Sequence, residues 1–155
     1  MAGGDAPDGA APGVWLARGV CRGLAARGYA VVTEMPLADG RRADVLGVDE
    51  RGGVLIVEVK ASRADFRADA KWDAYRAFCD RFAFAVPPEF PMDILPDEAT
   101  CGVLVADGYD AQVLREPPEH KLAGARRRAV LLRFARTAAR RLHRAIDPEA
   151  GVDDG

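Results

Sequence analysis

Two short apolar runs decide the fold of this chain: Arg42-Ala43-Asp44-Val45-Leu46-Gly47-Val48 and Val54-Leu55-Ile56-Val57-Glu58-Val59-Lys60. Both are rich in β-branched residues, and the segment between them, 49–53, is polar and ends in two glycines. Short β-branched runs joined by a polar, glycine-containing turn are typical of a β-hairpin. The sequence therefore predicts two antiparallel strands here.

The predicted hairpin brings charged side chains together. Because side chains alternate along a strand, Glu58 and Lys60 are expected on the same face. If Val48 pairs with Val54, antiparallel pairing places Asp44 directly opposite Glu58, with Cβ atoms ~5 Å apart. Charges are rarely placed in apolar strands, so we interpret this group as a candidate functional site.

Two facing carboxylates suit a hard divalent cation. Mg²⁺ prefers oxygen ligands and commonly takes one or two protein carboxylates, so Asp44 and Glu58 are candidate ligands, with the Val59 carbonyl beside them. Such an ion polarises a phosphodiester and lowers the pKa of an attacking water. Lys60 would orient that water or offset charge on the phosphate oxygens. Mg²⁺ is the expected cofactor, and Mn²⁺ is the alternative.

The rest of the chain supplies the elements of an α/β domain. A helix is expected over 14–27 and a strand over 29–34, and Gly28 is a stop signal between them. Ser62 and Asp65 form a capping pattern at the start of a helix expected to run to about Cys79. Further strands are expected over 82–86, 102–106 and 112–114, an irregular loop over 89–100, and a final helix over 121–146. The order αβββαβββα predicts a single domain over 13–146, with a mixed central sheet flanked by helices.

Composition narrows the class of protein. The 155 residues suit one domain; 49% are hydrophobic and 30% charged, and the net charge is −2. The three cysteines form no CxxC pair, and two histidines are too few for a zinc site, so a reduced cytoplasmic setting is expected. Residues 1–12 are expected to be a disordered leader and 147–155 an acidic disordered tail. No signal peptide or membrane span is predicted.

The pattern of Asp44 followed by Glu58-Val59-Lys60, on consecutive strands between two helices, resembles the core of PD-(D/E)XK nucleases. The surrounding residues are more specific. Gly40-Arg41-Arg42-Ala43-Asp44, Glu58-Val59-Lys60-Ala61-Ser62, 65–72, Tyr75 and 84–87 resemble the MmcB family of bacterial DNA repair proteins. The resemblance extends from about Val14 to Glu116. It implies a restriction endonuclease-like fold and a role in processing damaged DNA.

One feature departs from the nuclease pattern. Many such nucleases add an acidic residue from the first helix, but residues 14–27 contain none. Glu34, on the following strand, is the nearby candidate for a third metal ligand. Without such a ligand the domain could bind DNA without cutting it.

Basic residues are candidate DNA contacts. Near the hairpin and the following helix these are Arg41, Arg42, Ser62 and Lys71. On the final helix, Leu131, Phe134, Ala138, Leu142 and Ala145 form a stripe expected to pack on the sheet. The opposite side carries a strip of arginines without any acidic residue between 121 and 146, which is suited to a phosphate backbone. These arginines are Arg126, Arg133, Arg136, Arg140 and Arg144.

The leading hypothesis is a metal-dependent DNA endonuclease acting in DNA repair, in the cytoplasm at the nucleoid. The alternatives are a catalytically silent DNA-binding adaptor that recruits other repair proteins and, more remotely, a regulatory domain that acts on a protein partner. DNA is the expected main partner, a membrane is not expected, and homodimerisation is left open.

Overall fold

A computed structural model describes residues 9–150 of the chain. The first helix begins at Pro12, the last residue of the expected leader. The rest of that leader lies largely outside the described residues, as do the last five residues of the expected tail. The three cysteines are free thiols, as their spacing predicted.

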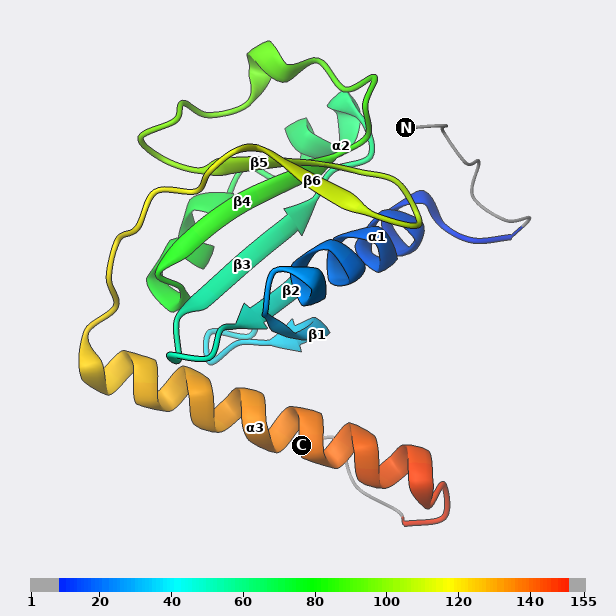
Figure 1. Cartoon of the computed structure of the whole chain (residues 1–155), viewed down its shortest axis with the longest axis vertical. Helices are drawn as coiled ribbons and strands as arrows, with labels where there is room; N and C mark the ends of the chain where they lie inside the picture. Colours follow the sequence, from blue (N-terminus) through cyan, green and yellow to red (C-terminus); the bar gives the residue numbers. More distant parts are fainter. Residues whose placement is uncertain (1–8, 151–155) are drawn as a thin grey trace.

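Six strands form one mixed sheet in the order β1-β2-β3-β4-β5-β6 (Figure 1). The first three strands are antiparallel to one another, β3, β4 and β5 are parallel, and β6 is antiparallel to β5. Their bounds are β1 (Ala30–Pro36), β2 (Arg42–Val48), β3 (Val54–Val59), β4 (Arg81–Val86), β5 (Gly102–Ala106) and β6 (Ala111–Arg115). The element order predicted from the sequence is confirmed: this is a single α/β domain.

Helix α1 (Pro12–Ala26) covers one face of the sheet. Pro12 stands at its first turn, where a missing N–H is tolerated, and Gly28 follows its end with φ +92°. Leu16, Val20 and Leu24 are buried against apolar side chains of β2 to β6. Gly19 is required on this helix, because a Cβ there would lie 1.7 Å from the Asp107 carbonyl oxygen. The helix is thus held tightly against the β5–β6 turn.

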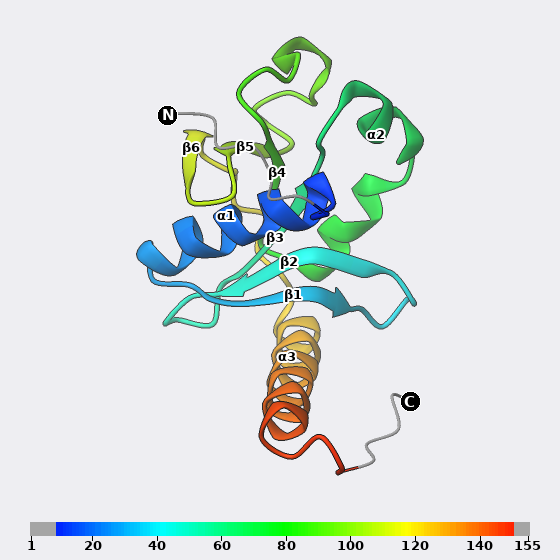
Figure 2. The ribbon, with the colours of Figure 1, turned by 90° about the vertical axis from the view of Figure 1, so that its right-hand side faces the viewer.

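The opposite face of the sheet packs against the segment after β3 and against the last helix. The sequence predicts a single helix from Ser62 to about Cys79, and this prediction is wrong. Two shorter elements are found instead: α2 (Arg63–Ala68) and a 3-10 helix, η1 (Trp72–Phe78) (Figure 2). The break lies at Asp69. The Asp69 backbone is non-helical (φ −101°, ψ 84°), and its carboxylate accepts from the Lys71 N–H (3.2 Å) and from Lys60 (3.0 Å).

The aromatic residues of the second piece fill the core. Trp72 and Tyr75 stack on Phe82, with ring centroids 5.8 and 6.2 Å apart. They are therefore packing groups. A further short 3-10 helix, η2 (Met92–Ile94), lies in the long loop after β4.

Helix α3 (Gly124–Ile146) packs against β1 and η1 and then extends beyond the body of the domain (Figures 1 and 2). Leu131, Phe134 and Ala138 contact the core, as predicted. Leu142 does not, because it is 62% exposed, and Ala145 is exposed as well. The predicted packing stripe therefore holds only for the first four turns. No helix in the described part of the chain is long and apolar enough to cross a bilayer.

A buried ion pair fastens the start of α3 to the sheet. The Asp80 carboxylate accepts two hydrogen bonds from the Arg127 guanidinium, both of 2.6 Å, and further ones from the Val54 and Leu122 N–H groups. Burial acts to raise the pKa of Asp80, but the hydrogen bonds outweigh it and lower the pKa to about 2. Asp80 therefore ties β3, β4 and α3 together as a permanent anion.

Candidate metal and nucleic-acid site

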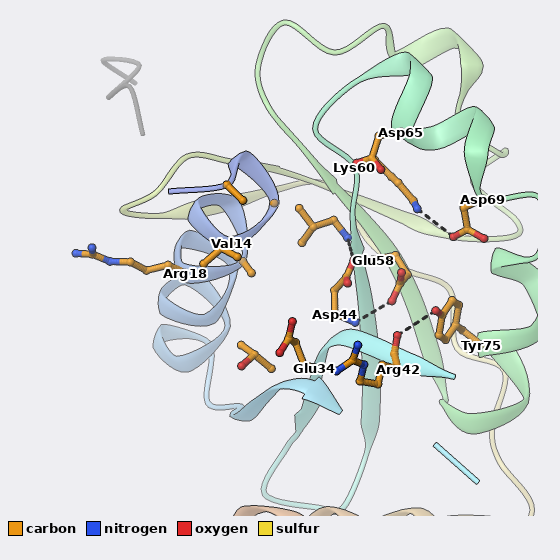
Figure 3. A pocket seen from close by; sticks show the side chains of 15 residues that line it. Val14, Arg18, Glu34, Arg42, Asp44, Glu58, Lys60, Asp65, Asp69 and Tyr75 are labelled. Atoms are coloured by element: carbon orange, nitrogen blue, oxygen red, sulfur yellow. Dashed lines mark hydrogen bonds and ion pairs between the residues drawn. The ribbon is translucent and has the colours of Figure 1, made fainter. Parts of the chain in front are cut away.

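The predicted register brings Asp44 and Glu58 together. Val48 pairs with Val54, and the ladder continues to Val45 and Val57. At the next position the two carboxylates replace the ladder bonds: the Asp44 N–H donates to Glu58 Oε1 (2.9 Å), and the Val59 N–H donates to Asp44 Oδ2 (2.8 Å) (Figure 3). The backbones of the two strands thus hold the two carboxylates side by side.

Glu58 is buried, with 4% of its surface exposed. Burial and the nearby Asp44 carboxylate raise the pKa of Glu58 to about 8, although the Asp44 N–H and Lys60 oppose this shift. Burial also raises the pKa of Asp44, against hydrogen bonds from Val59 and Glu58. Two carboxyl groups this close cannot both be ionised cheaply, so the pair holds a proton at neutral pH.

Lys60 lies next to the acid pair but points to another partner. Its side chain is buried, and its ammonium contacts the Asp69 carboxylate at 3.0 Å (Figure 3). Its backbone N–H donates to the Ala85 carbonyl (2.9 Å), which fixes the end of β3 against β4. Asp69 thereby holds the ammonium at the border of the site.

Glu34 lies beside Asp44 on the neighbouring strand. Thr33 pairs with Val45 and Met35 with Ala43, so Glu34 occupies the position opposite Asp44. Its φ of 46° is left-handed, which is uncommon for a residue with a side chain, and it interrupts the β1–β2 ladder. The Arg141 guanidinium of α3 donates to the Thr33 and Glu34 carbonyls, the latter at 2.7 Å. The unusual backbone is thus held by the last helix.

These side chains line one cavity of about 710 Å³. Helix α1 forms one wall, β1 to β3 form the floor, and α2 and η1 form the far side (Figure 3). The polar lining residues are Arg18, Thr33, Glu34, Arg42, Asp44, Glu58, Lys60, Asp65, Asp69 and Tyr75. The pocket is wide enough to admit a phosphate group with its water.

The donor set fits a hard cation through its chemistry. The buried Glu58 and the half-buried Asp44, both with raised pKa values, carry negative charge that no cationic side chain within residues 9–150 contacts, since Lys60 is bound to Asp69. A divalent ion would take up that charge and displace the shared proton. Within residues 9–150, no group of three acidic, histidine or cysteine side chains is arranged to hold a metal ion. Asp44, Glu58 and the Val59 carbonyl are the candidate ligands; Glu34 lines the same pocket but does not complete a three-residue group with the two carboxylates.

The predicted DNA contacts fall into two places. Near the pocket, Arg41 pairs with Asp39 (3.0 Å) and Lys71 is exposed, while the Arg42 carbonyl accepts from the Tyr75 hydroxyl (3.0 Å). Ser62 caps α2, accepting from the Asp65 N–H (3.1 Å), as the capping pattern predicted.

On α3, the predicted strip is less uniform than its spacing suggested. Arg126 lies over the Phe78 ring at 5.1 Å, and Arg144 is half-buried. Arg133, Arg136 and Arg140 are exposed. The exposed strip therefore centres on the middle of the helix.

The sequence does not predict the roles of several residues in or near the pocket. Asp69 was placed within a continuous helix, and nothing in its spacing marks it as the partner of Lys60. Arg141 contacts a strand more than 100 positions away in the chain, which no local pattern reveals. Asp65 was interpreted only as a cap, although its place three residues after Ser62 puts it at the rim of the pocket.

The structure defines a class of protein: an α/β domain with a partly buried acid pair in a pocket between α1 and strands β1 to β3 of a mixed sheet. Comparison with known families matches residues 7–149 to the family described as DNA repair protein MmcB-like. The chain therefore belongs to the MmcB-like family of DNA repair proteins.

A solved structure supports the same fold. A protein of unknown function from Silicibacter pomeroyi, SPO1766, is 48% identical and has a TM-score of 0.89. The alignment covers 95% of this chain and 99% of that one. A search of curated proteins found no match.

Proposed function

We propose that this protein is a metal-dependent deoxyribonuclease of PD-(D/E)XK type that hydrolyses phosphodiester bonds during DNA repair in the cytoplasm, at the nucleoid. The observation that carries the proposal is the partly buried Asp44–Glu58 pair, in which each carboxylate accepts a hydrogen bond from the backbone of the facing strand, at 2.8 and 2.9 Å. Its place beside Lys60 in a pocket of about 710 Å³, in a DNA repair family, favours nuclease chemistry.

In this proposal Asp44, Glu58 and the Val59 carbonyl hold Mg²⁺, or Mn²⁺ in its place. The ion would polarise the phosphodiester and lower the pKa of the attacking water. Lys60, released from Asp69 when a phosphate enters, would donate a hydrogen bond to that water or to a phosphate oxygen. Arg42 lines the same pocket and would hold a phosphate beside the scissile one. Arg18 also lines the pocket, but its guanidinium points away from the acid pair and lies over the Trp15 and Tyr109 rings, at 5.1 and 5.6 Å (Figure 3).

The exposed arginines of α3 would bind the DNA backbone farther along the duplex. Arg141 of the same helix contacts the carbonyls of Thr33 and Glu34, which line the acidic pocket. The helix is thus attached directly to the site that it would serve.

The test is cleavage of labelled single-stranded, duplex and branched DNA with Mg²⁺ or Mn²⁺. Glu58→Gln, Asp44→Asn and Lys60→Met should each lower the rate by at least ~100-fold, because each removes a proposed ligand or donor. Glu89→Gln, an exposed carboxylate in the loop after β4, is the matched control and should cut normally. Cleavage that persists in all three variants would refute the assignment.

A second candidate function is a DNA-binding adaptor without catalysis. Two observations favour it: Lys60 is bound by Asp69, and no third acidic ligand converges on the pair within residues 9–150. The adaptor predicts salt-sensitive DNA binding, no cleavage of any substrate, and equal binding by wild type and Glu58→Gln.

A further inference from the structure

Helix α3 carries a second apolar stripe that faces solvent. Its residues recur at alternating spacings of three and four: Leu132, Ala135, Ala139, Leu142 and Ile146. All five are exposed, and Leu132, Leu142 and Ile146 are 60, 62 and 74% exposed. We call these five residues the outer seam.

The outer seam differs from the face that packs on the domain. That inner face consists of Val130, Leu131, Phe134 and Ala138, which contact the main core. A 3–4 spacing keeps the seam on one side of a helix over four turns, a length of ~21 Å. It is the pattern by which one helix binds another, and a solvated helix face has no need of it.

The charges around the seam restrict its partner. Helix α3 contains eight arginines and no acidic residue. Arg128 and Arg136 are exposed; Arg128 is in line with the seam, four residues before Leu132, and Arg136 lies beside it. A second copy of α3 would bring like charges together, which disfavours pairing of this helix with itself. DNA phosphates would satisfy the arginines but leave the leucines and the isoleucine unused.

We propose that the outer seam binds an acidic amphipathic helix of another protein. The partner helix would place apolar side chains, two per seven residues, against Leu132, Leu142 and Ile146. Its glutamates or aspartates would pair with Arg128, in line with the seam, and with Arg136 along one edge of it. The small Ala135 and Ala139 allow close approach of the two helix backbones at the centre. The surface is separate from the acidic pocket and does not depend on nuclease activity.

The test uses two synthetic 21-residue helical peptides that share leucines at 3–4 spacing. One carries glutamate at the flanking positions and the other carries lysine. Fluorescence anisotropy should show that the full chain binds the glutamate peptide at least ~10-fold more tightly, with an affinity that falls as salt rises.

The triple variant Leu132→Gln/Leu142→Gln/Ile146→Gln removes the seam without changing the charge. It should weaken binding of the glutamate peptide by at least ~10-fold, the loss expected when apolar anchors leave an interface. Leu114→Gln, at a residue 62% exposed on β6, is the matched control and should bind like the wild type. Circular dichroism establishes that the triple variant keeps α3.

Three outcomes would overturn the proposal. Unchanged peptide binding by the triple variant would show that charge alone is responsible. A dimer seen by analytical ultracentrifugation, and lost in the triple variant, would assign the seam to a second copy of this chain. Loss of duplex DNA binding in the triple variant, with no peptide binding by the wild type, would assign it to DNA.

Discussion

Glu58 affects both the candidate metal site and the stability of the protein. Its pKa of about 8 lies above the value of 4.5 for a free glutamate, mainly through burial and then through Asp44. Between these values the folded state binds more protons than the unfolded state, so the free energy of unfolding falls as pH rises from about 4.5 to about 8. A site suited to a cation is therefore a destabilising site when it holds none.

Glu58→Gln should remove this cost. The amide oxygen still accepts from the Asp44 N–H, but the side chain no longer ionises. The variant should be more stable than wild type by on the order of 2 kcal/mol at pH 8.5, with little gain at pH 4.5. Urea unfolding without divalent ions, at both pH values, measures the difference. A gain that is equal at the two pH values would contradict the proposed protonation.

Asp80 has the opposite effect on the free energy of unfolding, because Arg127 and two backbone N–H groups compensate its charge. Asp80→Asn should destabilise the fold by about 3 kcal/mol, since it leaves the Arg127 guanidinium partly buried without its anion. The wild-type contribution is present above pH 3.8 and is lost as pH falls toward about 2. Asp73→Asn, which breaks the exposed Asp73–Arg76 pair, is the control and should cost less than ~1 kcal/mol. Equal losses in thermal unfolding would argue against Asp80 as the anchor of α3.

Helix α3 packs one face on the domain and leaves its other surfaces exposed to partners. Arg133→Gln/Arg136→Gln/Arg140→Gln should weaken duplex DNA binding uniformly across sequences. If each arginine contacts a phosphate, the slope of log K against log salt should fall by roughly 2–3. Arg63→Gln/Arg67→Gln, on the exposed side of α2, provides a comparison with charge removed elsewhere. An unchanged slope would exclude the strip as a backbone contact.

The elements also show how far the sequence predicts this protein. The β2–β3 hairpin was predictable with its register, because two short apolar, β-branched runs and the turn at 49–53 specify it locally. The break between α2 and η1 was not, since it depends on the ion pair of Asp69 with Lys60, a tertiary contact. The point at which α3 stops packing on the domain was not predictable either. The apolar residues keep a helical period of 3.6 residues as far as Ala145, but the sheet does not extend that far.

The same limit applied to the candidate site. Asp44, Glu58 and Lys60 could be grouped because they lie on adjacent strands. Glu34 could be named but not placed, because its left-handed backbone is held by Arg141 from the far end of the chain. Local pattern therefore predicts the floor of the pocket, and tertiary contacts arrange its rim.

The whole molecule combines a rigid domain, a buried acid pair and a basic helix that extends from the same body (Figure 2). The acid pair, α3 and the MmcB-like family match all favour work on DNA. Each part is separately testable: the pair by metal binding, the arginine strip by salt dependence and the outer seam by peptide binding. The arginine strip and the outer seam share Arg136, but the seam variant changes only Leu132, Leu142 and Ile146, so failure of one readout leaves the others interpretable.

We propose that Asp44 and Glu58 form a cation site that holds a proton until the ion binds. Mn²⁺ titration by calorimetry at pH 7, in two buffers with different ionisation enthalpies, tests this site. We expect Mn²⁺ to bind with release of close to one proton; Glu58→Gln and Asp44→Asn should lose this binding and Glu89→Gln should retain it. Mn²⁺ binding that is unchanged in Glu58→Gln, or that releases no proton, would contradict it.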